Sequence, residues 1–205
     1  MQQTQARVNI YALLSRVLLQ ELDLELLKTI KNDENILEFF PTFKDWKALK
    51  ELDDKKLIEE VINPDFVNLS VLHLIPYETF YTRDDQMVET GGANPVTDMY
   101  SAYDFMVDFE KARAVSADHI GVELEFMHHL ATAELKALEA EDKKAADELK
   151  EVQREFLNKH LLKWAPMYLI NLKYEARTPL YYDAADLALE FILSDNEYLI
   201  EELKK

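Results

Sequence analysis

Acidic and imidazole side chains gather in the stretch 116–130, in a pattern that could bind a metal ion. Glu125 and His128 have the Glu-x-x-His spacing of the carboxylate-bridged di-iron bundles, and His129 follows directly. Such a centre also needs a second Glu-x-x-His and two further inward glutamates, and the sequence has no second Glu-x-x-His. We therefore predict that the protein binds no metal and no cofactor. A metal-dependent helical-bundle enzyme centred on Glu125, His128 and His129 is an alternative.

The pair Asp118-His119 in the same stretch allows three interpretations. As a catalytic dyad it lacks an identifiable nucleophile, and adjacent residues of a helix do not face each other. As structure, Ser116 would cap a helix and Asp118 would lie in its first turn. His119 would then pair with Glu123, four residues later. As a binding site, the carboxylates beside Gly121 would receive arginines of a peptide. The residue types and spacing favour the structural interpretation.

Helical periodicity covers almost the whole chain, which has only 3 glycines and 6 prolines to interrupt it. No alternation typical of strands is sustained, so the sequence predicts an all-α helical bundle in a single domain over 1–205. The stretch at about 76–94 is the least regular, and we expect a long, partly ordered connection there. Asn94 is expected to cap the next helix, Pro166 to break one, and Thr178-Pro179 to open the last. Helices are expected at about 8–19, 24–30, 36–40, 43–52, 55–62, 65–75, 95–109, 116–141, 142–164, 167–174 and 179–203.

The composition restricts the partners of the protein. With 40 Asp and Glu against 23 Lys and Arg, the formal charge is −17, which disfavours nucleic acid and anionic membrane surfaces and favours cationic partners. There is no cysteine, no uninterrupted apolar stretch of about 18 residues, and no export signal at the start. The motifs of phosphate loops, dinucleotide sites, zinc proteases and serine hydrolases are absent. We expect a cytoplasmic protein that is not an enzyme of these classes.

Four segments, in order along the chain, together resemble one known family, the TorD/DmsD/NarJ chaperones that mature molybdenum-containing redox enzymes. The stretch from Asp118-His119 to Met127 resembles the Asp-His motif of that family. Residues 76–81, Pro-Tyr-Glu-Thr-Phe-Tyr, resemble its Pro-Tyr-Glu-Ser-x-Tyr segment. The other two matches are 11–15, which resembles the N-terminal helix, and 156–166, which resembles Phe-Leu-x-x-His-Leu-x-x-Trp-x-Pro.

The resemblance implies an all-helical chaperone of the TorD-like type that is not an enzyme and needs no cofactor of its own. Its partner would be the catalytic subunit of a molybdoenzyme, bound through a twin-arginine signal peptide or N-terminal segment. Export or membrane attachment would be delayed until the cofactor is inserted. The matching positions assign peptide binding to Asp118, His119, Tyr77, Glu78, Tyr81 and Glu123.

Several alternatives stay open. Tyr77 and Tyr81 could equally be core anchors, because tyrosine buries a large ring while keeping its hydroxyl wet. His160 and Trp164 are expected to pack inside the protein. The family commonly has a proline before the Asp-His pair, where this chain has Ser116-Ala117, so the entry into the helix could differ. A generic acidic adaptor that binds some other helix is a further alternative, and a monomer and a homodimer are both possible.

Overall fold

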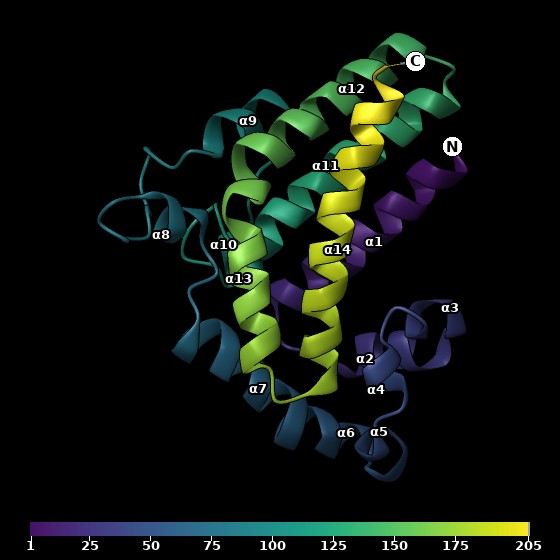
Figure 1. The fold of residues 1–205 in the computed structure, drawn as a ribbon, viewed down its shortest axis with the longest axis vertical. Helices are drawn as coiled ribbons and strands as arrows, with labels where there is room; N and C mark the ends of the chain where they lie inside the picture. The colour runs from purple at the N-terminus through teal and green to yellow at the C-terminus, as the bar shows by residue number, and fades with distance from the viewer. Residues whose placement is uncertain (205) are drawn as a thin grey trace. The chain divides into compact units, whose positions relative to one another are not determined.

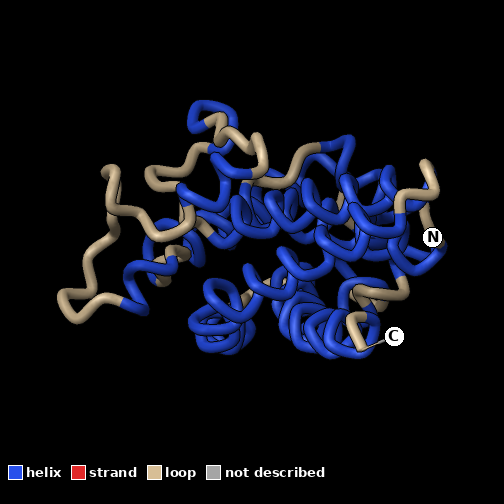
Figure 2. The backbone as a smooth tube through the Cα atoms, turned by 90° about the horizontal axis from the view of Figure 1, so that it is seen from above, coloured by secondary structure: helices blue, strands red, loops and turns tan. Residues whose placement is uncertain are grey.

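The structure is a computed structural model that describes residues 1–204, and these residues form helices joined by turns and loops. Figure 2 shows the helices in blue and no strand in the described residues. The one β-type pairing in this part of the chain is an isolated antiparallel bridge between Tyr77 and His119. The predicted all-α class is therefore confirmed. No helix within 1–204 combines the length and the apolarity that crossing a membrane requires.

The chain divides into two compact units, each built from separate stretches of sequence. Unit 1 comprises Met1–Leu19, Tyr77–Pro166 and the described residues from Phe191 onward. Unit 2 comprises Gln20–Pro76 and Met167–Glu190. A single domain over 1–205 would require the two units to unfold together, and this stays a prediction.

The helices of the two units are drawn and labelled in Figure 1. Unit 1 contains α1 (Gln2–Leu19), α8 (Glu78–Thr82), α9 (Thr97–Ala102), α10 (Phe109–Ala112), α11 (Ile120–Glu139), α12 (Lys143–Phe156) and the π-helical turn η3 (Leu157–Leu161). Unit 2 contains α2 (Leu24–Asn32), α3 (Glu34–Leu37), α4 (Pro41–Lys44), α5 (Lys47–Glu51), α6 (Asp54–Lys56), η1 (Leu57–Ile62), α7 (Asn63–Val67) and η2 (Asn68–His73). The division passes through α13 (Leu162–Glu175) and α14 (Pro179–Glu202).

The core of unit 1 is organised by the packing of α1 against α11. α11 is apolar over much of its surface, and its residues Ile120, Val122 and Leu124 have no exposed area. At the crossing, a Cβ on Gly121 would lie 2.6 Å from the Cβ of Leu19, which is closer than real contacts allow. Ser15 Oγ donates to the carbonyl oxygen of Gly121 at 2.9 Å. The two backbones approach this closely because residue 121 has no side chain.

A buried arginine ties the helices of unit 1 together by side-chain contacts. Arg7 on α1 donates through Nε to Asp195 on α14 at 2.5 Å and through Nη1 to Glu134 on α11 at 2.7 Å. Its Nη2 donates to Gln153 on α12 at 2.5 Å, and the Tyr11 hydroxyl donates to Asp195 at 2.6 Å. Because a buried charge is costly unless it is paired and hydrogen-bonded, these contacts fix the relative positions of four helices.

Buried carboxylates play a similar part in unit 2. Asp65 Oδ2 accepts from the backbone N–H groups of Arg177 and Thr178 at 3.0 and 2.8 Å, just before α14 begins. Asp183 Oδ2 accepts from the backbone N–H of Phe43 at 2.8 Å. The start of α14 is therefore held by a side chain distant in sequence, and the predicted opening at Thr178-Pro179 is confirmed.

Several predicted helix boundaries are wrong, among them the end of the helix expected at 95–109, because α9 ends at Ala102 and α10 begins only at Phe109. Asn94 does not cap a helix, because α9 begins at Thr97 and the Asn94 amide donates instead to the carbonyl oxygen of Glu89 at 3.0 Å. Pro166 does not end a helix, because it lies inside α13. Its neighbours Trp164 and Tyr168 are almost wholly buried. Packing on both sides of the proline thus outweighs a local cost of about 3 kcal/mol.

The close approach at Gly121 leads to a stability prediction. We expect Gly121→Ala to lower the free energy of unfolding by about 1–3 kcal/mol, because the added methyl group overlaps Leu19 and the backbones must separate. Urea denaturation followed by circular dichroism measures this. Gly92→Ala is the matched control, since nothing lies within 4 Å of its Cβ position. Equal stability of the two variants would contradict the packing account.

Candidate functional site

Two of the segments singled out in the sequence meet in unit 1. The backbone N–H of Glu78 donates to the carbonyl oxygen of Asp118 at 3.0 Å, and Tyr77 and His119 form the isolated bridge. The segment before α8 therefore lies antiparallel to the segment before α11. This pairing brings Tyr77, Glu78, Asp118 and His119 together although about 40 residues separate the two motifs.

The carboxylate of Asp118 is fully buried and accepts four hydrogen bonds. Its Oδ2 accepts from the backbone N–H and from the hydroxyl of Thr79, at 2.8 and 2.7 Å. Its Oδ1 accepts from the Asn94 amide at 2.9 Å and from the Ser116 hydroxyl at 2.5 Å. Asp118 therefore caps the start of α8 from another part of the chain. The predicted position of Asp118 in the first turn of its own helix is wrong.

His119, not Ser116, caps α11. The helix begins at Ile120, and His119 Nδ1 accepts from the backbone N–H of Gly121 at 3.1 Å, so the ring proton resides on Nε2. The predicted Ser116 cap is wrong because the Ser116 hydroxyl points away from α11, with its single proton between the Asp118 carboxylate and the carbonyl oxygen of Glu89. The predicted pair between His119 and Glu123 is not formed either. Burial lowers the pKa of His119 to about 4, so the ring is neutral near pH 7.

Two buried glutamates lie beside these residues. Glu78 Oε2 lies 2.9 Å from His160 Nδ1 on η3, and Glu123 Oε2 accepts from Trp164 Nε1 at 3.3 Å. Burial, and then the charges of Glu78 and Asp118, raise the pKa of Glu123 well above its usual value. The protonated carboxyl is therefore the favoured form of Glu123, because two like charges in a dry site cannot both be stable.

Tyr77 and Tyr81 are half-buried, unlike the acidic residues. The Tyr77 hydroxyl accepts from the backbone N–H of Val115 at 3.1 Å, and its ring meets the His119 ring edge-on at 5.1 Å. The Tyr81 ring stacks on Trp164 at 5.4 Å, and burial raises the pKa of Tyr81 to about 12. Each ring therefore has one part packed inside the unit and another part exposed to solvent.

A hollow of about 540 Å³ adjoins this cluster on the side of α8, α9 and η3. Its lining includes the side chains of Glu78, Thr82, Met99, Lys159, His160 and Lys163. It belongs entirely to unit 1. The predicted peptide-site residue Glu78 and the predicted packing residue His160 therefore both border open space.

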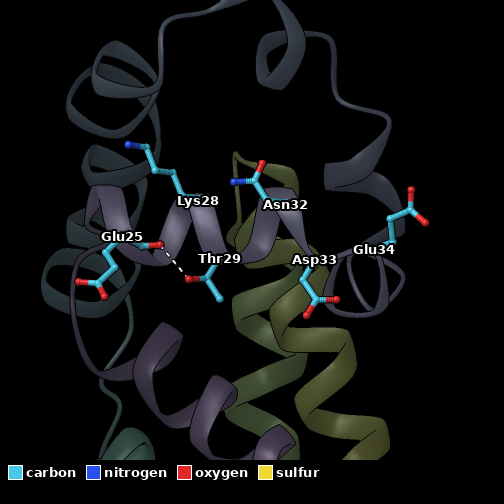
Figure 3. A pocket seen from close by; sticks show the side chains of 6 residues that line it. All are labelled: Glu25, Lys28, Thr29, Asn32, Asp33 and Glu34. Carbon is cyan, nitrogen blue, oxygen red and sulfur yellow. Dashed lines mark hydrogen bonds between the residues drawn. The ribbon is translucent and has the colours of Figure 1, made fainter.

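Another hollow, of about 540 Å³, lies in unit 2. Its six lining side chains are all exposed, and Figure 3 shows them along α2 and at the start of α3. The one hydrogen bond drawn there runs from the Thr29 hydroxyl to the carbonyl oxygen of Glu25, at 3.0 Å. This hollow contains none of the residues that the sequence singled out.

The histidines that suggested a metal centre bond to backbone carbonyl groups. His128 Nδ1 lies 3.1 Å from the carbonyl oxygen of Val8, and His129 Nε2 lies 2.9 Å from that of Tyr103. Glu125 is exposed. Within residues 1–204 no group of three or more acidic or histidine side chains is placed to hold a metal ion.

Sequence reasoning did not predict the role of three residues that hold the site together. Thr79, Asn94 and Ser116 supply the donors for Asp118, and only Asn94 and Ser116 had drawn attention, each as a helix cap. A buried aspartate needs several donors, which was a usable signal, but spacing along the chain cannot say which donors they are.

Comparison with known proteins gives a consistent result. The sequence model of the family described as nitrate reductase delta subunit matches residues 38–169. A "Chaperone protein TorD" from Vibrio cholerae is 28% identical over 163 residues, which cover 78% of this chain and 71% of that protein. Proteins of the same name from Vibrio parahaemolyticus and Vibrio atlanticus are 24% and 23% identical over 159 residues, which cover 76% of this chain and 72% of each relative. No solved structure matches the chain.

The hydrogen bonds of Asp118 lead to a prediction about the connection 76–94. We expect Asp118→Ala to lower the free energy of unfolding by about 2–4 kcal/mol, because it leaves the buried Thr79 N–H without its acceptor and removes one of the acceptors of the Asn94 amide. Limited proteolysis should then cut the connection faster. Asp84→Ala, which removes an exposed carboxylate from the same connection, is the control. A loss of stability in both variants alike would contradict the assignment.

The neutral, buried ring of His119 leads to a pH prediction. Its pKa in the folded protein is about 4 against 6.5 in the unfolded chain, so the unfolded state takes up the proton first as the pH falls. Stability is therefore complete above about pH 6.5 and decreases by about 3 kcal/mol down to pH 4. Urea unfolding at several pH values measures the slope. His119→Asn keeps a capping acceptor without a titrating ring, and an unchanged slope in this variant would refute the prediction.

Proposed function

This chain belongs to the nitrate reductase delta subunit family, and we propose that within that family it binds the twin-arginine signal peptide or N-terminal segment of its client. The family and the TorD relatives make it a chaperone for the maturation of a molybdoenzyme, not an enzyme itself. The client is therefore a molybdenum-containing oxidoreductase. The part of the client that is bound, and the site that binds it, are the proposal.

The observation that carries the proposal is the junction of the two motifs. The Glu78 N–H donates to the carbonyl oxygen of Asp118, and the Asp118 carboxylate caps α8 through Thr79. This arrangement presents the half-buried rings of Tyr77 and Tyr81 beside a hollow lined by Glu78. Half-exposed aromatic rings next to carboxylates suit a peptide that has both a cationic and an apolar part.

The six proposed residues have different roles in binding, according to how deeply each is buried. Tyr77 and Tyr81 contact the peptide directly, since part of each ring is open. Asp118 holds the segment that carries these rings by accepting hydrogen bonds from Thr79, and His119 holds it by pairing with Tyr77. The remaining two residues are buried: Glu78 supplies negative potential, and Glu123, which holds its proton, lies beside it.

The net charge of −17 supports the same partner. An acidic surface raises the rate at which a cationic segment meets the chaperone, and salt weakens this effect. We propose that the complex forms in the cytoplasm and delays export or membrane attachment of the client until its cofactor is inserted. A bound signal peptide is not available to the export machinery, so binding alone produces the delay.

Calorimetry with a synthetic peptide tests the proposal. The peptide contains two consecutive arginines followed by an apolar segment. We expect the wild type to bind it and Tyr81→Ala to bind it about tenfold more weakly, because truncating an aromatic contact costs about 1–2 kcal/mol. Affinity should also fall as sodium chloride rises from about 50 to 500 mM, since screening shortens the range of the charge interactions.

The control for this experiment is Tyr174→Ala, which removes an exposed tyrosine from α13 in unit 2. Circular dichroism of each variant establishes that it is folded. An absence of binding by the folded wild type would overturn the proposed function. Equal weakening by Tyr81→Ala and Tyr174→Ala would overturn the location of the site.

A further inference from the structure

The hollow beside α8 has two buried ionisable groups on its wall. Glu78 is 3% exposed and His160 is 7% exposed, and both border the open space. The partner of the Glu78 carboxylate is the His160 ring, with Nδ1 at 2.9 and 3.2 Å from its two oxygens. No lysine or arginine among the described residues pairs with Glu78. A buried carboxylate therefore borders a cavity and has no permanent cation paired with it, although Lys159 and Lys163 also line that cavity.

Two further acidic side chains lie beside Glu78, and of these Asp118 is the one that adds negative charge, since Glu123 holds its proton. Asp118 and Glu123 are fully buried in the same cluster, and their donors are uncharged groups such as the Trp164 indole and the Thr79 hydroxyl. Glu123 Oε1 is buried and has no hydrogen-bond partner. Buried ions are stable only when they are paired and hydrogen-bonded, so this cluster has capacity for one more positive group.

We propose that the hollow takes an arginine side chain of the client peptide, that its guanidinium binds the Glu78 carboxylate, and that binding releases a proton from Glu123. This inference rests on the proposed function and deepens it, because it places the cationic part of the peptide and couples binding to a proton. Guanidinium is the suitable cation, since its planar donors match a carboxylate in a two-point contact and it stays charged when partly dehydrated.

The proton balance follows from the charges. In the free protein, burial and then the charges of Glu78 and Asp118 raise the pKa of Glu123, so the carboxyl holds its proton. A guanidinium on Glu78 adds one positive charge nearby, lowers that pKa again, and the proton leaves to solvent. The groups that face Glu123 from the packed elements are Glu78 on α8, Asp118 before α11, Tyr100 on α9 and Trp164 on α13, and His160 on η3 borders Glu78.

Two lysines among the lining side chains differ in their effect on an entering cation. Lys159 is paired with Glu155, one turn earlier, so its charge is balanced. Lys163 lines the hollow, is exposed, and makes no ion pair in the described part of the chain. Its ammonium group repels a guanidinium that enters. The same arrangement therefore predicts that loss of Glu78 weakens binding and that loss of Lys163 strengthens it.

Titration calorimetry in phosphate and in Tris, whose ionisation enthalpies differ, tests the inference with the same twin-arginine peptide. We expect the wild type to release a net fraction of a proton, up to about one, and to bind more tightly as the pH rises, by up to about tenfold per pH unit. Glu123→Gln should bind without that release. A peptide whose two arginines are replaced by citrulline, which keeps the shape but not the charge, should release none.

Variants on either side of the hollow complete the test. Glu78→Gln should bind at least about tenfold more weakly and Lys163→Gln more tightly, whereas Glu151→Gln, an exposed change on α12, should match the wild type. Proton release by Glu123→Gln equal to that of the wild type would overturn the inference. So would a Glu78→Gln variant that is folded and binds as tightly as Glu151→Gln. If either of these results is found and the wild type still binds the peptide, the inference fails but the proposed function stands. If the folded wild type does not bind the peptide at all, the proposed function itself is refuted.

Discussion

The carboxylate of Asp118 is the interaction on which the geometry of the site depends. It gathers donors from Thr79 at the start of α8, from Asn94 at the end of the irregular connection, and from Ser116 before α11. Three segments that have no strand or long helix of their own thereby share one acceptor. Because the buried Thr79 N–H would otherwise lack an acceptor, and the Asn94 and Ser116 donors would keep fewer, the order of each segment supports that of the others.

The hydrogen bonds of Asp118 also determine the positions of the neighbouring side chains. With α8 capped, Glu78 lies next to His160, and the Tyr81 ring lies on Trp164. η3 and the first turn of α13 thus contribute to the same cluster, and π-helical turns are often found at functional positions. An acidic interior beside half-open aromatic rings results from tertiary contacts that no single helix could provide.

The helices and the family were accessible from the sequence, and the contacts of the site were not. Periodicity was enough for α1, α11 and α14, because their apolar faces repeat over many turns. Capping rules failed at Asn94 and Ser116, since both side chains found partners distant in sequence that local rules ignore. The pair of Glu78 with His160 spans 82 residues and follows from packing alone. The peptide contacts assigned to the six residues stay predictions.

The arginine at the centre of unit 1 has a consequence for the time at which the protein can fold. Arg7 and its partner Asp195 are separated by 188 positions in the chain. During synthesis, α1 leaves the ribosome long before α14 exists, and a buried guanidinium that lacks one of its two carboxylate partners is unfavourable. Unit 1 therefore closes only after α14 has been synthesised, so its native core forms late, when all of its helices are present.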